Sequence, residues 1–298
     1  MNIITTIEDM QKLATEIREE RKTIGFVPTM GNLHKGHASL IKKAKTTSDF
    51  VVVSVFVNPT QFGPNEDFET YPRTLDEDAK LVEDLGADVL FHPSAADMYP
   101  QDNPIMVHVT QGVDVLCGEK RPGHFDGVAT ILTKLFHIVS PHHVYFGLKD
   151  AQQVAIVQQL IQDFHFQIQL FPCPLIREED GLAMSSRNSK LSAEERKEAL
   201  HLNRALKLGE SLIEKGEKST EVIKSSITRY FYKNLNLGEL DYVDILRYPE
   251  LKPVDELSGQ VIIACAVKYK QARLIDNRIL MIPAAKEVLG YAKTHDEK

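Results

Sequence analysis

The sequence predicts an α/β protein in which a doubly wound parallel sheet, over residues 1–180, precedes a smaller C-terminal α+β domain, over residues 181–298. Two observations predict this fold. In the first 180 residues, short β-rich runs with little charge alternate with stretches whose apolar residues keep helical spacing. After Arg187 the chain changes to charged, capped helices followed by two strand-like runs, so the second domain begins near residues 176–190.

The first part of the chain contains five strand-like runs separated by amphipathic stretches. The runs occupy residues 23–27, 50–57, 87–91, 144–146 and 166–171. They are short and carry little charge, which is typical of strands that are covered on both faces of a parallel sheet. Helical spacing marks residues 7–17, 128–139 and 154–161. This alternation predicts ligand sites beyond the carboxyl ends of the strands, where the strand order reverses.

The second part begins with a helix whose start is marked by a capping box, Ser192 followed by Glu195. This helix is expected to run to Ile213, and another helix is expected over residues 220–234. Strand-like runs at residues 242–246 and 261–267 complete a small α+β domain. A hinge between the two domains would let the second close over the first as a lid.

Composition limits the partners of this chain. Its 298 residues are 43% apolar and 26% charged, which is enough for one large core and a smaller one. Thirty-five basic and forty-two acidic side chains give a net charge of −7, which argues against a protein that coats nucleic acid. The sequence has no apolar stretch of membrane-spanning length and no signal-peptide pattern. We therefore expect a soluble, cytoplasmic protein with neither a nucleic-acid nor a membrane partner.

The most informative motif is His34-Lys35-Gly36-His37, which follows the apolar run 23–27 and opens a helix-patterned stretch. A helix start presents unpaired backbone N–H groups and the positive end of the helix dipole, which suits the phosphates of ATP. Taken alone, two histidines at this spacing could also be a metal pair or two capping residues on the surface. A second phosphate-binding segment would favour the nucleotide.

Such a segment is Met184-Ser185-Ser186-Arg187-Asn188, which is rich in hydroxyl groups and carries a guanidinium that can bind phosphate oxygens bidentately. Together the two segments resemble the nucleotidyltransferase superfamily, with its His-x-Gly-His signature and its mobile Lys-Met-Ser-Lys-Ser loop. Here Ala183 and Ser186 stand where the two lysines of that loop would lie. Arg187 therefore has to supply the positive charge.

Polar loops follow two of the predicted strands. Asn58-Pro59-Thr60-Gln61 comes after the run 50–57, although it could equally be an ordinary Asn-Pro turn. Gly147-Leu148-Lys149-Asp150 follows the run 144–146 and starts a helix, with Gln153 one turn further on the same face. It offers an ammonium and a carboxylate to a ligand, but Asp150 could instead cap the helix. A third loop, Arg121-Pro122-Gly123-His124-Phe125, adds a cation and a titratable ring on a turn.

In this order, the segments resemble the pantothenate synthetase family over nearly the whole chain. The matching motifs are Pro28-Thr29-Met30-Gly31 before the histidine motif, Val57-Asn58-Pro59 with Gln61-Phe62-Gly63, Tyr71-Pro72-Arg73, the loop from Arg121 to Phe125, Lys149-Asp150-Ala151-Gln152-Gln153, and Met184 to Asn188. The resemblance implies a homodimeric enzyme with a Rossmann-like ATP domain and a small C-terminal domain. It implies ATP-dependent condensation of (R)-pantoate with β-alanine through a pantoyl adenylate, with release of AMP and pyrophosphate.

The resemblance also implies the site residues. ATP contacts would come from Met30, Gly31, Asn32, Leu33, His34, Lys35, Gly36, His37, Gly147, Leu148, Lys149, Asp150, Ile176, Met184, Ser185, Ser186 and Arg187. Among these, the catalytic residues would be His34, His37, Lys149 and Arg187, which can stabilise the charge that spreads over the phosphates. His37 would be the proton donor. Gln61 and Gln153 would bind pantoate, and Gln61 would also lie near β-alanine.

Magnesium should accompany ATP, because it bridges phosphate oxygens and usually keeps several waters. The acidic side chains of Glu77 and Asp78 could help to hold it. A solvated helix face also explains such an acidic run.

Two other functions share parts of this pattern. A nucleotidyltransferase would move a nucleotide onto a phosphorylated acceptor, but such an acceptor favours a second basic cluster over the amides of Gln61 and Gln153. A non-catalytic nucleotide-binding regulator would need neither the histidines nor Arg187. Release of AMP in a turnover assay would separate these functions.

Overall fold

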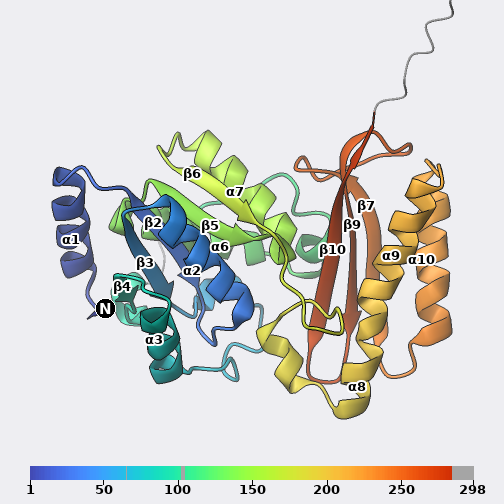
Figure 1. Cartoon of the computed structure of the whole chain (residues 1–298), viewed down its shortest axis with the longest axis horizontal. Coiled ribbons are helices and arrows are strands. Elements are labelled where there is room, and N and C mark those ends of the chain that lie inside the picture. The colour runs from blue at the N-terminus through green and yellow to red at the C-terminus, as the bar shows by residue number, and fades with distance from the viewer. Residues whose placement is uncertain (65, 102–104, 284–298) are drawn as a thin grey trace, which may run out of the picture.

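The chain folds into two units that lie side by side, each built around its own sheet (Figure 1). The computed structural model describes residues 1–64, 66–101 and 105–283. The first sheet has the strand order β1-β4-β3-β2-β5-β6, and the second has the order β10-β9-β7-β8. This arrangement confirms the predicted α/β fold with a doubly wound parallel sheet and a smaller α+β unit.

The strands of the first sheet are all parallel. They are β1 (Asn2–Ile4), β2 (Ile24–Thr29), β3 (Phe50–Val55), β4 (Val89–Phe91), β5 (His143–Gly147) and β6 (Gln169–Cys173). Phe26, Val52 and Val53 at the centre of the sheet are fully buried. Burial on both faces explains why these runs contain almost no charged residues.

Helices cover both faces of this sheet. On one face, α1 (Ile7–Glu19), α6 (His124–Val139) and α7 (Ala151–Asp163) share a core with β2, β3 and β5. On the other face, α2 (Lys35–Thr47) and α3 (Leu75–Asp84) pack against the same central strands. Two short helices, α4 (Ala95–Met98) and α5 (Leu116–Lys120), lie in the connection between β4 and α6. The sheet is therefore doubly wound.

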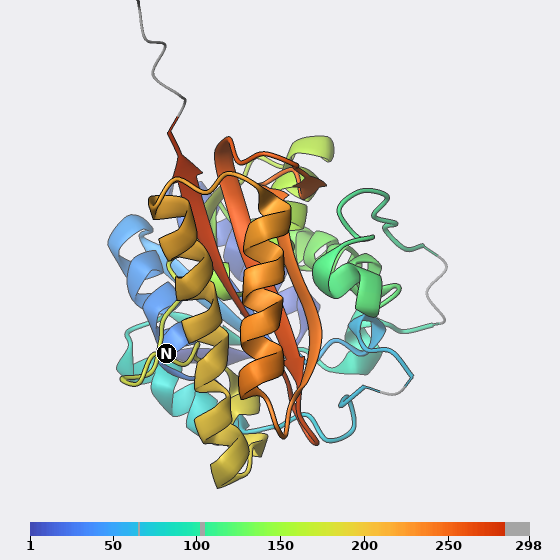
Figure 2. The ribbon, with the colours of Figure 1, turned by 90° about the vertical axis from the view of Figure 1, so that its right-hand side faces the viewer.

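The second unit is an antiparallel sheet with helices on one side. Its strands are β7 (Glu239–Arg247), β8 (Lys252–Pro253), β9 (Gly259–Lys268) and β10 (Arg273–Ile282). Figure 2 shows α9 (Leu200–Glu214) and α10 (Thr220–Asn234) side by side across this sheet. Their apolar side chains, among them Leu206, Ile227 and Phe231, form a core of their own with β7 and β9.

Several predicted boundaries differ from the structure. The single helix expected from Ser192 to Ile213 is two helices, α8 (Ala193–Glu198) and α9, separated by a tight turn in which the Leu202 N–H donates to the Ala199 carbonyl. The run 166–171 is shifted, since β6 begins at Gln169. Neither β1 nor β10 was predicted, because β1 has only three residues and β10 mixes apolar residues with charged ones.

The connection between the two units runs from the end of β6 to the start of α8. The predicted boundary between residues 180 and 181 falls in this connection and stays a prediction. Residues 284–298, which belong to the predicted second domain, lie outside the described residues.

The strand order reverses between β2 and β5, which are neighbours at the centre of the first sheet. The carboxyl end of β2 leads to the histidine motif, and that of β5 leads to the short 3₁₀ helix η2 (Leu148–Asp150). Polar loops from distant parts of the sequence therefore meet at this edge.

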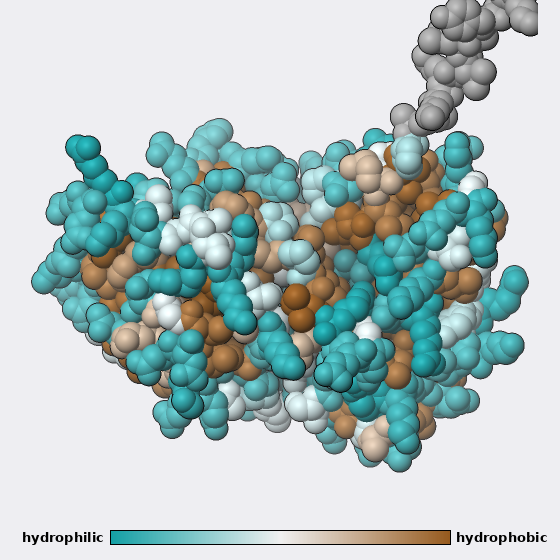
Figure 3. Space-filling model, viewed as in Figure 1, coloured by the Kyte–Doolittle hydropathy of each residue, from teal (hydrophilic) through white to brown (hydrophobic). Residues whose placement is uncertain are grey.

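The surface of the molecule is mainly polar. Hydrophilic side chains cover most of the face drawn in Figure 3, with smaller hydrophobic patches between them. None of the helices in the described part of the chain combines the length and the apolar character that crossing a bilayer requires.

Candidate active site

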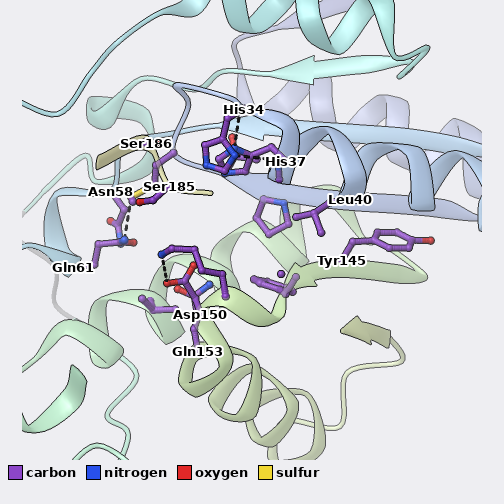
Figure 4. Close-up of a pocket in the computed structure, with 18 of the residues that line it drawn as sticks. His34, His37, Leu40, Asn58, Gln61, Tyr145, Asp150, Gln153, Ser185 and Ser186 are labelled. Carbon is purple, nitrogen blue, oxygen red and sulfur yellow. Dashed lines mark hydrogen bonds and ion pairs between the residues drawn. The ribbon is translucent and has the colours of Figure 1, made fainter. Parts of the chain in front are cut away.

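A cavity of about 240 Å³ opens at the carboxyl ends of β2, β3 and β5. In Figure 4, the two histidines lie on one side of it, Asp150 and Gln153 lie opposite, and Gln61 lies near Ser185 and Ser186. The predicted site residues that line it are Met30, His34, Gly36, His37, Gln61, Gly147, Lys149, Asp150, Gln153, Ile176, Met184, Ser185, Ser186 and Arg187. The structure thus brings both predicted phosphate-binding segments to one cavity.

The remaining predicted ATP contacts lie beside the cavity and do not line it: Gly31, Asn32, Leu33, Lys35 and Leu148. Lys35 is exposed to solvent. The carbonyl of Asn32 accepts a 3.1 Å hydrogen bond from the Ser186 hydroxyl, so the histidine-motif loop and the serine segment are in direct contact.

The two histidines form the N-terminal cap of α2. His34 is the N-cap, and its Nδ1 accepts a hydrogen bond from the Gly36 N–H at 3.1 Å. The Nδ1 of His37 accepts from the His34 N–H at 3.3 Å. Since both Nδ1 atoms are acceptors, each neutral ring carries its proton on Nε2. The His34 ring packs so closely over Gly36 that an added Cβ would lie 2.8 Å from it, so any other residue at position 36 would displace the ring.

Both rings are neutral at physiological pH. Burial, helped by the Lys149 ammonium, lowers the pKa of His34 from 6.5 to about 4. Burial and the adjacent His34 ring lower the pKa of His37 from 6.5 to about 3. In the ligand-free protein, His37 can therefore donate a hydrogen bond from Nε2–H but holds no extra proton to transfer.

These low pKa values predict that the protein loses stability in mild acid. Each ring becomes protonated near pH 6.5 in the unfolded chain but only near pH 3 to 4 in the folded one, so the unfolded state binds more protons in between. The free energy of unfolding should fall by about 1 kcal/mol per ring between pH 7.5 and pH 5.5. Urea denaturation at the two pH values measures this loss, and the loss should be smaller in His37→Gln. Equal losses in the two proteins would contradict the assignment for His37.

Asp78 anchors the loop that carries the histidines. Its buried carboxylate accepts hydrogen bonds from the backbone N–H groups of Asn32, at 2.9 Å, and Leu33, at 2.7 Å, and from the Thr74 hydroxyl. Gly31 approaches this carboxylate with a φ of +84°, a conformation that favours glycine. A structural role for Asp78 was not anticipated, because the sequence does not show that α3 lies beside this loop.

The predicted magnesium ligands receive no support from this arrangement. Both oxygens of Asp78 are engaged by protein donors, and Glu77 is exposed to solvent. Within residues 1–64, 66–101 and 105–283, no three His, Cys, Asp or Glu side chains are grouped so that they could hold a metal.

Gln61 is held in one orientation by a buried amide. The Nδ2 of Asn58, which is only 1% exposed, donates to Gln61 Oε1 at 3.1 Å and to the Gly127 carbonyl at 3.1 Å. Its Oδ1 accepts from the Tyr99 hydroxyl at 2.7 Å, so the Asn58 amide cannot turn over without losing these bonds. Gln61 therefore presents its Nε2 donor to the cavity, near the sulfur of Met30.

The cations of the site are paired with carboxylates. Lys149 Nζ lies 3.4 Å from Asp150. Arg187 lies 3.0 Å from Asp67, which also pairs with Lys190 at 2.7 Å. A triphosphate that approaches Lys149 or Arg187 therefore competes with a carboxylate that is already in place.

A second cavity of about 560 Å³ adjoins the first between the two units. Both cavities are lined by Arg121, His124, Lys149, Asp150, Gln153 and Arg187. Arg121 pairs with Glu66 at 2.5 Å, and His124 Nδ1 lies 2.8 Å from the Gln61 carbonyl. The loop from Arg121 to Phe125, whose cation and titratable ring were noted in the sequence, thus contributes to the walls of both cavities.

Two features of the site were missed from the sequence. Val128, Ile131, Leu132 and Leu135 on α6 form an apolar wall of the first cavity, although their helical spacing was visible in the sequence. The second unit supplies Asn277 to the second cavity. No local signal marks Asn277, because its side-chain hydrogen bonds are with residues more than a hundred positions away.

A parallel sheet whose switch point carries a His-x-Gly-His turn, beside lysine, arginine and serine side chains that suit phosphate, defines a Rossmann-like nucleotide-binding enzyme. A sequence profile of the Pantoate-beta-alanine ligase family matches residues 2–279. The pantothenate synthetase of Geobacillus sp. (strain WCH70) is 55% identical over 282 residues, which are 95% of this chain and 100% of that protein. The chain therefore belongs to the pantoate-β-alanine ligase family, and it is an enzyme of the ligase class.

Solved structures agree with this assignment. The crystal structure of pantothenate synthetase from Thermus thermophilus matches with a TM-score of 0.88 and 38% identity, covering 93% of this chain and 99% of that one. The pantoate-β-alanine ligase of Francisella tularensis, complexed with βγ ATP and β-alanine, matches with a TM-score of 0.75 and 35% identity, covering 94% of this chain and 97% of that one. The resemblance to the pantothenate synthetase family is thereby confirmed.

Proposed function

We propose that this enzyme condenses (R)-pantoate with β-alanine at the expense of ATP, forming pantothenate, AMP and pyrophosphate through a pantoyl-adenylate intermediate. The family membership supports the overall reaction. One observation about the site carries the proposal: the same cavity is lined by side chains that can donate hydrogen bonds to phosphate and by the uncharged amides of Gln61 and Gln153. Such amides suit the hydroxyl groups and carboxylate of pantoate without repelling a phosphate.

In the first step, a carboxylate oxygen of pantoate attacks the α-phosphorus of ATP, and the bond to the β-phosphate oxygen breaks as pyrophosphate leaves. Charge accumulates on the phosphate oxygens during this step. His34 and His37 would donate Nε2–H hydrogen bonds to them, and Lys149 and Arg187 would supply positive charge. Backbone N–H groups at the start of α2 would add to the positive electrostatic potential around the phosphates.

In the second step, the neutral amine of β-alanine attacks the acyl carbon of the adenylate, the amine loses a proton, and AMP leaves as the amide forms. This step needs the two reactants to be aligned and needs no protein nucleophile. The second cavity adjoins the first at Gln153 and Lys149, so it offers a route by which the amine can approach.

Magnesium would enter as the complex with ATP, which is the substrate, and would be held by phosphate oxygens and water. The described residues offer no cluster of acidic and histidine ligands, which fits an ion that arrives with its nucleotide. As the resemblance implies, the enzyme would work as a homodimer, and its composition and sequence pattern would place it in the cytoplasm. Analytical ultracentrifugation tests the dimer.

Exchange of labelled pyrophosphate into ATP tests the proposed reaction order. The protein is incubated with magnesium and ATP, together with pantoate alone, β-alanine alone, or neither. We expect exchange with pantoate alone, because adenylate formation does not need the amine. Exchange that required β-alanine, or that was absent from folded protein in all three mixtures, would overturn the pantoyl-adenylate route.

Gln153 provides a direct test of the pantoate site. In Gln153→Ala, the polar groups of bound pantoate lose a partner inside the cavity, which should cost about 1–3 kcal/mol. The Michaelis constant for pantoate should therefore rise by about 5- to 150-fold, while that for ATP changes little. Gln159→Ala is the matched control, because Gln159 lies on the same helix, donates to Asp163 and is outside the lining of both cavities. An unchanged constant for pantoate would remove Gln153 from the site.

A further inference from the structure

Asn277 reaches from the second unit into the ATP loop of the first. It lies on β10, the edge strand that faces the first unit in Figure 1, and is only 8% exposed. Its Nδ2 donates to the backbone carbonyls of Leu148 and Lys149, both at 2.9 Å. The Asn277 side chain thus donates both of its N–H groups to two consecutive residues, and the backbone of these residues positions the Lys149 side chain.

The preceding residue on β10 makes a second connection of the same kind. Asp276, which is 1% exposed, accepts two hydrogen bonds from Arg177, at 2.7 and 2.9 Å. Arg177 follows Ile176, which lines the first cavity. The Asp276 carboxylate also accepts from the Asn277 N–H at 2.7 Å. Two successive residues of the second unit therefore contact two separate segments that border the cavity.

These contacts suit a positioning role better than simple packing. The carbonyls that Asn277 binds belong to η2, a 3₁₀ helix of only three residues, and hydrogen-bond geometry in such helices is poorer than in an α-helix. An apolar residue at position 277 would fill the same space but would leave both carbonyls without this donor. The amide thus sets the direction of the backbone from which the Lys149 side chain extends.

We propose that Asn277 is a positioning residue for Lys149, through which the second unit orders the ATP loop of the first. The inference rests on the proposed function, because it assigns Lys149 to the phosphates. When the second unit is seated, the two amide hydrogen bonds hold Lys149 in its place in the cavity. When the second unit moves away, the loop loses both hydrogen bonds. The position of Lys149 is therefore coupled to the position of the second unit.

The test compares steady-state pyrophosphate exchange in variants of the full chain. Asn277→Asp keeps the shape of the side chain but replaces the two N–H donors with acceptors that repel the carbonyls. We expect the rate of pantoate-dependent exchange to fall about 10- to 100-fold. Asn277→Ser, which keeps one donor, should lie between Asn277→Asp and the unmodified enzyme. Asn234→Asp is the matched control, because the Asn234 amide donates to a backbone carbonyl too, but that carbonyl belongs to Tyr230 of the second unit and Asn234 lies on α10.

A double-variant experiment separates positioning from general destabilisation. If Asn277 acts through Lys149, then adding Asn277→Asp to Lys149→Met should lower the exchange rate by less than about threefold. A further loss as large as the one that Asn277→Asp causes alone would show that Asn277 acts independently of Lys149 and would overturn the proposal. Exchange rates of Asn277→Asp and Asn277→Ser equal to that of the unmodified enzyme would also overturn the proposal. Absence of exchange in the unmodified enzyme would instead count against the proposed function.

Discussion

Replacing His37 by alanine should lower the rate of pantoate-dependent pyrophosphate exchange by about 10²- to 10³-fold, the usual cost of losing one donor to a transition-state oxygen. The His37 Nδ1 is occupied by the His34 N–H, so the Nε2–H is the atom available to the phosphates. The substitution also removes half of the capping box, which loosens the start of α2. Single-turnover measurement of adenylate formation would show whether the loss lies in the chemical step.

Two substitutions separate the donor from the cap. His37→Gln can accept from the His34 N–H through its amide oxygen and still offer an N–H₂ group, so it should retain more activity than His37→Ala. His37→Glu can form the capping box but offers no donor and adds negative charge, so it should be at least as slow as His37→Ala. Equal rates for the glutamine and glutamate variants would contradict the assignment of His37 as a hydrogen-bond donor.

The second large effect is expected for Lys149→Met, which keeps the length of the side chain but removes its charge. Lys149 is the cation that extends from the switch-point loop after β5, and it lines both cavities. Its loss should reduce exchange by about 10²- to 10³-fold, because charge on the leaving pyrophosphate is no longer balanced in a partly buried site. The carboxylate of Asp150, left without its 3.4 Å partner, would also repel the nucleotide.

Lys42→Met is the control for charge alone, since Lys42 is an exposed residue of α2 outside both cavities. It should leave the exchange rate nearly unchanged. Lys149→Arg keeps the charge but changes its shape, and we expect a smaller loss than for methionine. If Lys149→Met exchanged pyrophosphate as fast as Lys42→Met, Lys149 would have no part in balancing the phosphate charge.

Elements governed by local interactions were predictable from the sequence. The apolar runs at β2, β3 and β5 are each continuous in the chain, and their lack of charged residues directly indicates burial on both faces. The capping box at Ser192 and Glu195 is likewise confirmed, since both of its hydrogen bonds join residues three positions apart. The motif His34-Lys35-Gly36-His37 marked the start of α2 for the same reason, and the helix begins inside it, at Lys35.

Features that depend on distant contacts were not predictable in this way. Asp78 looked like one of a run of solvated acids, and only the packing of α3 beside the histidine loop shows that its carboxylate is occupied by backbone donors. The orientation of Gln61 depends on Asn58 and Tyr99, and Tyr99 is brought there by a separate part of the chain. Asn58 lies only three residues before Gln61, but the fold brings Tyr99 to Asn58 and the backbone donors to Asp78, and these contacts leave no periodic or spacing signal.

By itself, the sequence determined the class of fold, the family and the two phosphate-binding segments, because these follow from hydrophobic periodicity and from short motifs whose residues act together locally. The tertiary structure decided which of these residues share one cavity, which nitrogen of each histidine faces it, and how Asn277 and Asp276 of the second unit contact its loops. These properties depend on hydrogen bonds and burial between segments far apart in the chain, and such contacts exist only after the two sheets have packed together.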